Sequence, residues 1–203
     1  MNNDTFATKG NLIKAKKTLA LCTMGFDLLD RKRNVLIREI LLLIDNAKAL
    51  NGVVEETFLS AHEALENANI TLGVIGSLAE SVDIDDGLNV TYRNVMGVEI
   101  PQLELAQKPL EVNYGMYNTN SQLDIAYIKF AQAKRLCALL AETETAVFRL
   151  SNAIKRVQRT ANSLKNVMIP KYRELVVQIT DTLEEREREE FSQLKVIKSK
   201  KSG

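Results

Sequence analysis

A heptad repeat of apolar residues runs through two long stretches of the chain and limits the folds open to it. In the first stretch, eight of nine residues at seven-residue spacing from Leu12 to Ala68 are apolar. In the second, all seven residues at the same spacing from Ala133 to Leu175 are apolar. When the positions three residues after members of each series are included, 25 of 27 are apolar. With 45% hydrophobic residues, chance would give about 12. The repeat predicts a left-handed coiled coil.

Glycine and proline divide the chain, because five of nine glycines and two of three prolines lie between residues 73 and 115. We expect a first long helix over 8–76, a loop and β-hairpin over 77–118, a second long helix over 119–198, and a tail over 199–203. Pro170 is expected to kink the second helix.

Helix length sets the expected shape. A helix of about 65 residues is roughly 100 Å long, whereas a compact chain of this size has a radius of gyration of about 17 Å. We therefore expect one elongated domain over residues 1–203, mainly α, in which two long helices pair antiparallel. Aligning their ends would place residue i near residue 200 − i.

The middle of the chain is typical of extended structure. Residues 88–100 are rich in β-branched and aromatic side chains that alternate imperfectly, with Gly97 as a candidate bulge. A second extended piece is expected over Leu110 to Tyr114, so that the two form a small hairpin. The candidate hairpin residues are Val95, Met96, Gly97, Val98 and Pro101.

Charge and hydropathy exclude several classes of protein. Lys and Arg number 27 and Asp and Glu 26, a net charge of +1, which gives no overall attraction to nucleic acid or an anionic membrane. The longest uncharged stretch, residues 67–79, is shorter than the roughly 18 residues that a spanning helix needs. No signal peptide pattern opens the chain, so we expect a cytoplasmic protein without a transmembrane segment.

No catalytic or metal-binding constellation is found. His62 and Glu63 begin like a zinc-protease motif, but Glu66 stands where the second histidine is needed. Cys22 and Cys137 fall on apolar stripes and are interpreted as small core residues. We expect no catalytic residue, no cofactor and no metal.

Five motifs spread in order along the chain carry a family resemblance. They comprise Thr8 to Leu12 with Lys16 to Leu19, Gly25 to Leu36, Asn94 to Pro101, Asn166 to Pro170, and Glu187 to Lys195. Together they resemble the D subunit of the rotary V-type and A-type ATPases. Gln158-Arg159-Thr160 departs from the family, which usually has a Val-Asn-Ala-like run there.

The resemblance implies a non-catalytic central shaft that transmits torque. Its termini would enter the catalytic hexamer of A and B subunits, and a funnel-shaped subunit, named C or d, would seat it on the membrane ion-translocating ring. The small F subunit would bind residues 60–80 and 115–150, with exposed apolar candidates at Ile75, Leu78, Tyr117 and Ile128. The protein would lie peripheral to the membrane within the ATPase complex.

Basic side chains are concentrated in two runs, one in each long stretch. Under the 200 − i register, residues 31–38 would lie beside residues 162–169, and we expect a positive belt facing acidic loops of the hexamer. The belt comprises Arg31, Lys32, Arg33, Arg38, Lys155, Arg156, Arg159, Lys165, Lys171 and Arg173.

Two other classes of protein remain open. A prefoldin-like chaperone also combines antiparallel coiled-coil helices with a β-hairpin, but exposes apolar helix ends to its clients. The charge-dense run from Glu184 to Glu190 argues against it. A generic coiled-coil scaffold is the second alternative.

Overall fold

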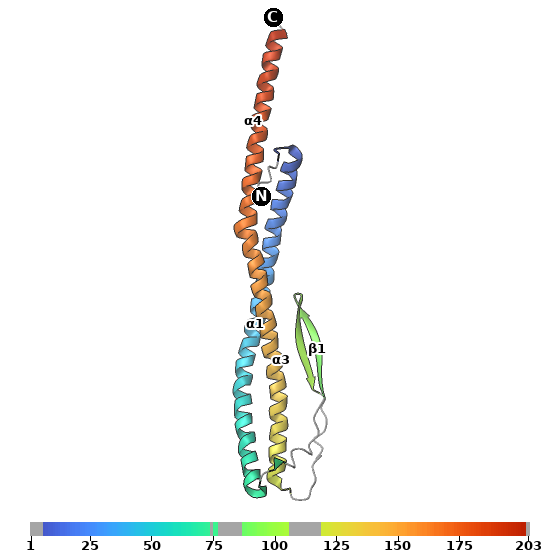
Figure 1. Cartoon of the computed structure of the whole chain (residues 1–203), viewed down its shortest axis with the longest axis vertical. Helices are drawn as coiled ribbons and strands as arrows, with labels where there is room; N and C mark the ends of the chain where they lie inside the picture. The colour runs from blue at the N-terminus through green and yellow to red at the C-terminus, as the bar shows by residue number, and fades with distance from the viewer. Residues whose placement is uncertain (1–5, 74, 77–86, 106–118, 202–203) are drawn as a thin grey trace. The chain divides into compact units, whose positions relative to one another are not determined.

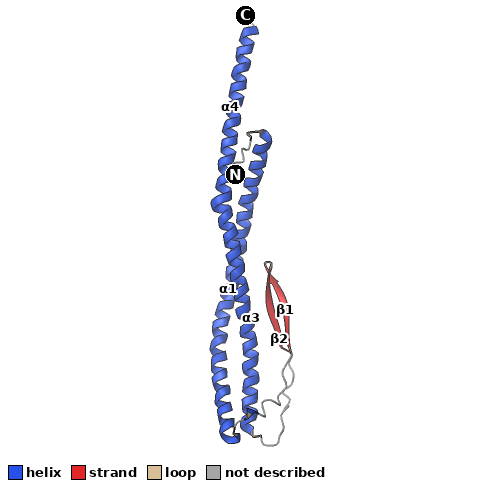
Figure 2. Cartoon of the chain, viewed as in Figure 1, coloured by secondary structure: helices blue, strands red, loops and turns tan. Residues whose placement is uncertain are grey.

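The computed structural model describes residues 6–73, 75–76, 87–105 and 119–201, which form long helices and one hairpin (Figure 1). In chain order the elements are α1 (Lys9–Leu72), β1 (Leu88–Val95), β2 (Val98–Leu105), α3 (Ser121–Ser163), a π-helix (Leu164–Met168) and α4 (Ile169–Lys201). Helix dominates, and the two strands form one antiparallel sheet (Figure 2). The predicted mainly α fold with a hairpin in the middle of the sequence is confirmed.

The chain divides into two compact units. Unit 1 comprises Met1–Asn34 and Lys155–Gly203, and unit 2 comprises Val35–Ile154. Within each unit, a segment of α1 runs antiparallel beside a later helical segment. The expectation of one elongated domain over residues 1–203 stays a prediction.

Both ends of α1 follow from local chemistry. At its start, the Thr8 hydroxyl accepts a hydrogen bond from the Asn11 amide at 3.2 Å, which satisfies a donor that the first turn leaves unpaired. At its end, Gly73 has a φ of 78°, and its amide donates to the carbonyl of Asn69 at 2.9 Å. A glycine in this left-handed conformation ends helices commonly, so α1 ends at Leu72, short of the expected residue 76.

The register of the helix pair differs from the expected one. In unit 1, Arg33 bonds Gln158 and Phe26 lies beside Lys165. In unit 2, the ring of His62 contacts that of Phe130. These pairs follow a register of about 191 − i in both units, so the expected 200 − i was wrong. A heptad seam determines which faces meet but allows several alignments along the axis, and aligning the helix ends chose the wrong one.

Small residues fill much of the seam. Besides alanine, the buried apolar set includes Leu36, Val54, Leu150, Val157 and Ile179, with Ile100 from the hairpin. The buried alanines are Ala15, Ala61, Ala64, Ala68, Ala126, Ala133, Ala146 and Ala161. Helix axes approach more closely where the contacting side chains are small.

The helical irregularity near Pro170 takes the form of a π-helix. Residues Leu164–Met168 form this segment, and the Ile169 amide donates to the carbonyl of Leu164, one residue further back than in an α-helix. Pro170 has no amide hydrogen, and in a regular α-helix its ring would crowd the carbonyl of Asn166. The wider π turn before the proline relieves that crowding, where a simple kink was expected.

The hairpin has a tighter turn and a different second strand from those expected. Met96 and Gly97 have φ values of 51° and 79°, the two positive values of a type I′ turn. The Asn94 side chain accepts a hydrogen bond from the Gly97 amide at 2.7 Å, and Val95 pairs with Val98. Gly97 is therefore a turn residue and not a bulge. The expected strand over residues 110–114 lies outside the described residues, and the second strand is Val98–Leu105.

Candidate partner-binding surfaces

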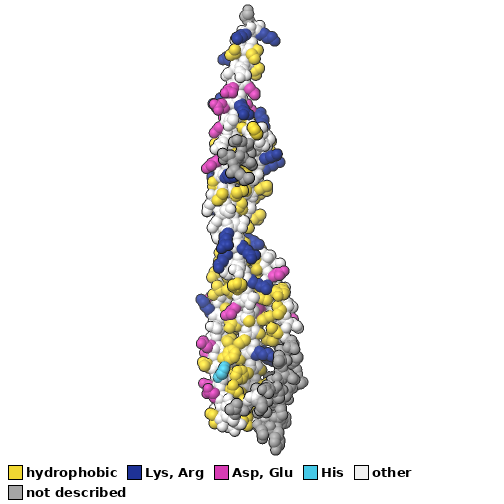
Figure 3. Space-filling view, viewed as in Figure 1, with side chains coloured by type: hydrophobic (Ala, Val, Ile, Leu, Met, Phe, Trp, Pro, Cys, Tyr) yellow, Lys and Arg dark blue, Asp and Glu magenta, His cyan; other side chains and the backbone are white. Residues whose placement is uncertain are grey.

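The basic residues of unit 1 lie mostly on its exposed surface. Arg31 of α1 is exposed, and so are Lys155, Arg156 and Arg159 of α3. The observed register brings residues 31–33 level with residues 158–160, so these two basic runs do share a height in this unit. Figure 3 shows a group of Lys and Arg side chains gathered on the visible face, with few acidic ones beside them.

Other members of the predicted belt lie elsewhere. Lys165, Lys171 and Arg173 are exposed but lie level with residues of α1 that precede Asp27, because the register is about 191 − i. Lys165 places its ammonium 5.7 Å from the ring centre of Phe26, a cation–π contact. Arg38 is exposed and belongs to unit 2.

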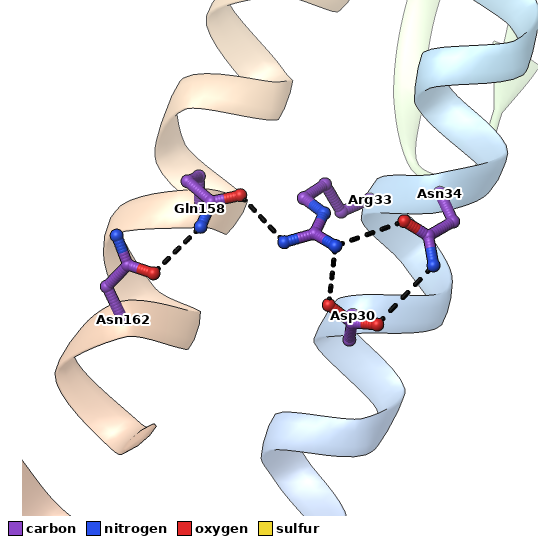
Figure 4. A network of polar contacts seen from close by, with 5 residues as sticks. All are labelled: Asp30, Arg33, Asn34, Gln158 and Asn162. Atoms are coloured by element: carbon purple, nitrogen blue, oxygen red, sulfur yellow. Dashed lines mark hydrogen bonds and ion pairs between the residues drawn. The ribbon is translucent and has the colours of Figure 1, made fainter. Parts of the chain in front are cut away.

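Arg33 is held in a polar cluster inside the helix pair (Figure 4). Its guanidinium bonds Asp30 at 2.7 Å, Gln158 at 3.0 Å and Asn34 at 3.2 Å, and Gln158 in turn donates to Asn162 at 2.7 Å. Its side chain is only 26% exposed, and its Nε is buried without a partner in the described chain. Arg33 joins the two helices through its bond to Gln158, and Asp30 compensates its charge. The predicted belt had counted Arg33 among the outward charges. Gln158, where the sequence departs from the family motif, is its partner on α3.

Charged contacts join the start of α1 to the middle of α4. Lys9 forms an ion pair of 2.9 Å with Glu187, and the hydrogen bond and negative charge of Glu187 raise the pKa of Lys9. Arg186 donates to the carbonyl of Ala7 at 3.2 Å. These contacts mark the level at which α1 begins.

Beyond Glu187, α4 continues to Lys201 with every residue exposed. Phe191, 70% exposed, lies with Leu194 and Ile197 at three-residue spacing on one side of this segment. No described residue covers them. The sequence predicted a charged run and a family motif here, and the spacing of these apolar residues was a further readable signal.

Unit 2 exposes many large apolar side chains, which appear as yellow areas in Figure 3. Ile128, predicted to contact the F subunit, is among them, and Ile75 is half-buried. Leu78 and Tyr117 lie outside the described residues. The exposed set on α1 and α3 comprises Leu41, Leu42, Val53, Leu59, Ile70, Ile125, Ile128, Leu139 and Phe148.

Two side chains of α3 hold the hairpin against that helix, within unit 2. A Glu142 carboxylate oxygen accepts a hydrogen bond from the Leu103 amide at 2.9 Å. Arg149 donates to the carbonyl of Glu99 at 3.0 Å and lies 5.3 Å from the ring centre of Tyr92. Glu142 and Arg149 are seven residues apart and lie on one face of α3, so this face binds the outer edge of β2.

The remaining hairpin candidates lie at the turn and in the middle of β2. Pro101 and its neighbour Ile100 are buried, whereas Met96 at the turn is exposed. Val95 and Val98 flank the turn and are half-buried.

The single histidine and the two cysteines lie on the long helices α1 and α3. His62 is exposed, and its Nδ1 lies 2.8 Å from the carbonyl of Phe58 while its ring meets that of Phe130 edge-on. Cys22 and Cys137 are free and half-buried. Across the described ranges, no group of three His, Cys, Asp or Glu side chains could hold a metal ion. In the same part of the chain, no helix is long and apolar enough to cross a membrane.

Antiparallel long helices and a two-stranded hairpin define a coiled-coil protein. Comparison with known proteins narrows this class. Residues 11–199 match the family described as the D subunit of ATP synthase. The chain therefore belongs to the ATP synthase D-subunit family.

Three relatives illustrate the breadth of this match. The D subunit of the V-type ATP synthase of Thermotoga neapolitana is 40% identical over 195 residues, which cover 95% of this chain and 96% of the relative. The D subunit of the A-type ATP synthase of Pyrococcus furiosus is 33% identical over 197 residues, covering 95% and 92%. That of Methanobrevibacter smithii is 32% identical over 201 residues, covering 95% and 85%.

Proposed function

We propose that this chain is the central-stalk shaft of a rotary V-type or A-type ATPase. The observation that carries the proposal is the family match over nearly the whole chain, in a protein made of paired long helices. The shaft transmits torque between the hexamer that hydrolyses or makes ATP and the membrane ring that moves ions. It catalyses no reaction itself, and it lies in the cytoplasm, peripheral to the membrane.

The hexamer of A and B subunits surrounds the basic part of unit 1. Arg31, Arg156 and Arg159 are exposed at one level, and no acidic residue lies between Lys155 and Arg173. Attraction between a basic surface and acidic loops acts at long range and tolerates rotation, whereas point-fitted hydrogen bonds do not. This supports a belt centred on these residues, with Arg33 left out because Asp30 compensates its charge.

The F subunit and the funnel-shaped subunit, C or d, bind the rest of the shaft. Unit 2 exposes Leu59, Ile70, Ile125 and Ile128, which lie in or beside the ranges expected for the F subunit. Exposed apolar side chains in such numbers support a protein partner, because burying them from water is favourable. Hydrogen exchange with and without the F subunit should show protection over these residues; protection confined to the two termini would contradict this placement.

Reconstitution tests the main proposal. The chain is expected to co-purify with the A and B subunits and to be required for coupling ATP hydrolysis to ion movement. If it fails to bind them and suppresses aggregation of unfolded clients, the prefoldin-like alternative holds. If it does neither, the chain is a coiled-coil scaffold of another assembly.

Charge reversal tests the basic belt. Arg31→Glu with Arg156→Glu should weaken binding of the shaft to the hexamer and lower coupling, and the remaining attraction should fall further as salt rises. The matched control is Lys48→Glu with Arg135→Glu, which reverses two charges of unit 2. Equal assembly and equal ion pumping by the two double variants across a salt series would remove the belt from the proposal.

A further inference from the structure

The two edges of the hairpin differ in their hydrogen bonding. On β2, the Leu103 amide and the Glu99 carbonyl bond side chains of α3. Hydrogen-bonded and non-hydrogen-bonded pairs alternate along an antiparallel ladder. Glu99, Pro101, Leu103 and Leu105 therefore direct their backbone groups to the outer edge, and Pro101 fits there because an outward amide is not needed by the ladder.

The same alternation identifies the free groups of β1. Leu88, Val90, Tyr92 and Asn94 pair with Leu105, Leu103, Pro101 and Glu99, so their amides and carbonyls also face outward. In the described chain, nothing bonds this outer edge. Every β1 residue before Val95 is exposed. A row of four such residues is long enough to bond a further strand.

Natural proteins commonly protect an exposed edge with proline, a bulge, charge or a covering element. β1 contains no proline and no bulge, and its one charged residue is Arg93. Val90 and Tyr92 are nonetheless 48% and 59% exposed. An edge with four outward-facing residues and this little protection can pair with another chain.

We infer that the outer edge of β1 binds an extended segment of another subunit of the ATPase, which adds to the hairpin as a third strand. The backbone row selects an extended polypeptide, because only a strand matches its repeat of donors and acceptors. The side chains select its sequence: apolar residues beside Val90 and Tyr92, and an acidic residue beside Arg93, whose charge is exposed on the opposite face. That the segment comes from the ATPase rests on the proposed function.

Residue-level hydrogen exchange on the isolated chain and on the reconstituted ATPase tests the inference. In the isolated chain, the inward amides of Thr91 and Arg93 should be protected and the outward amides of Val90 and Tyr92 should exchange freely. In the complex, the outward amides should slow by about tenfold or more. A complex that assembles without this protection overturns the inference and leaves the proposed function intact. Failure to assemble overturns both.

Two variants at one position separate the backbone from the side chain. Val90→Pro removes an outward amide at a ladder position equivalent to that of Pro101 on β2, so the hairpin should keep its inward protection while Tyr92 loses its protection in the complex. Val90→Ala keeps the amide and should keep the protection of Tyr92. Equal protection of Tyr92 in both variants would overturn the inference.

Arg93→Glu tests whether the partner segment carries an acidic residue beside Arg93. This variant does not put a proline into the strand, so it does not remove a backbone amide. Reversal should weaken protection of Val90 and Tyr92 in the complex, and higher salt should reduce the difference from the original chain. Unchanged protection would overturn the acidic assignment. Protection that rises with concentration in the isolated chain would instead identify a second copy as the occupant, against the inference.

Discussion

In the described chain, unit 2 buries more apolar residues than unit 1, and alanine is prominent in both. Of the ten apolar residues buried in the described part of unit 2, six are alanines, whereas unit 1 buries Ala15, Val157, Ala161 and Ile179. Alanine lets two helices approach closely but leaves little room for larger side chains between them. Both units expose large apolar side chains, such as Leu59 and Ile128 in unit 2 and Leu21 and Leu28 in unit 1. Unit 1 also carries the exposed basic side chains and one polar cluster across its seam.

The exposed apolar and basic side chains indicate two kinds of partner contact. Apolar side chains that the core does not use remain available for burial by another protein, which suits a stable partner. Exposed basic side chains attract an acidic surface without fixed geometry, which suits a partner that moves past them. Mutations can test the packing described for each unit, and the effects below run from the largest expected to the smallest.

Leu150→Ala should lower the free energy of unfolding by about 2–5 kcal/mol, because Leu150 is fully buried and its removal leaves a cavity. Leu139→Ala on the same helix is the matched control, since Leu139 is 46% exposed and should lose only about 0.5 kcal/mol. Urea unfolding followed by helical circular dichroism measures both. Equal losses would show that unit 2 does not separate buried from exposed leucines as described.

Ala61→Leu should lower the free energy of unfolding by about 1–3 kcal/mol, because the alanine seam has no space for three further carbon atoms. The control is Ala49→Leu on the exposed side of α1, expected within about 0.5 kcal/mol of the original chain. The same urea titration applies. A neutral or stabilising Ala61→Leu would contradict close approach of the helices.

Gln158→Leu should cost about 1 kcal/mol, because Arg33 loses an acceptor while its Nε already lacks one. Asp30 and Asn34 remain as partners, which limits the loss. Adding Arg33→Leu should recover that loss, since apolar replacement of both members of a buried polar pair is often neutral or stabilising. A double-mutant cycle measures the coupling, and no coupling would show that Arg33 and Gln158 act independently.

The Lys9–Glu187 pair should have the smallest effect, because Lys9 is exposed and salt screens such pairs. A lysine whose pKa is raised on folding contributes stability below its unfolded pKa and loses it as pH rises through the folded one. Lys9→Gln should speed amide exchange near the start of α1 at neutral pH. The difference should vanish once pH has risen well above the ordinary lysine pKa of 10.5 and past the raised one. A difference that persists there would indicate that the pair is not electrostatic.

Local sequence signals predicted the elements well. The heptad repeat identified both helical stretches because apolar spacing directly reports the buried face of a helix. The Gly97 region was recognised as part of a hairpin, yet Met96 concealed the turn, because type I′ turns usually carry Asn or Gly at that position. The exposure of Phe191 and of the apolar residues after it was not predicted, because spacing alone does not say whether a partner helix covers them.

The sequence by itself determined the helix pair, the hairpin's place in the chain and the family, because each depends on local periodicity or on residues matched in order. Only the tertiary structure decided the register of about 191 − i, since a repeating seam leaves the axial alignment open until particular side chains meet. That alignment made Gln158 the partner of Arg33. It also decided which leucines are buried, such as Leu36 and Leu150, and which are exposed, such as Leu59 and Leu139.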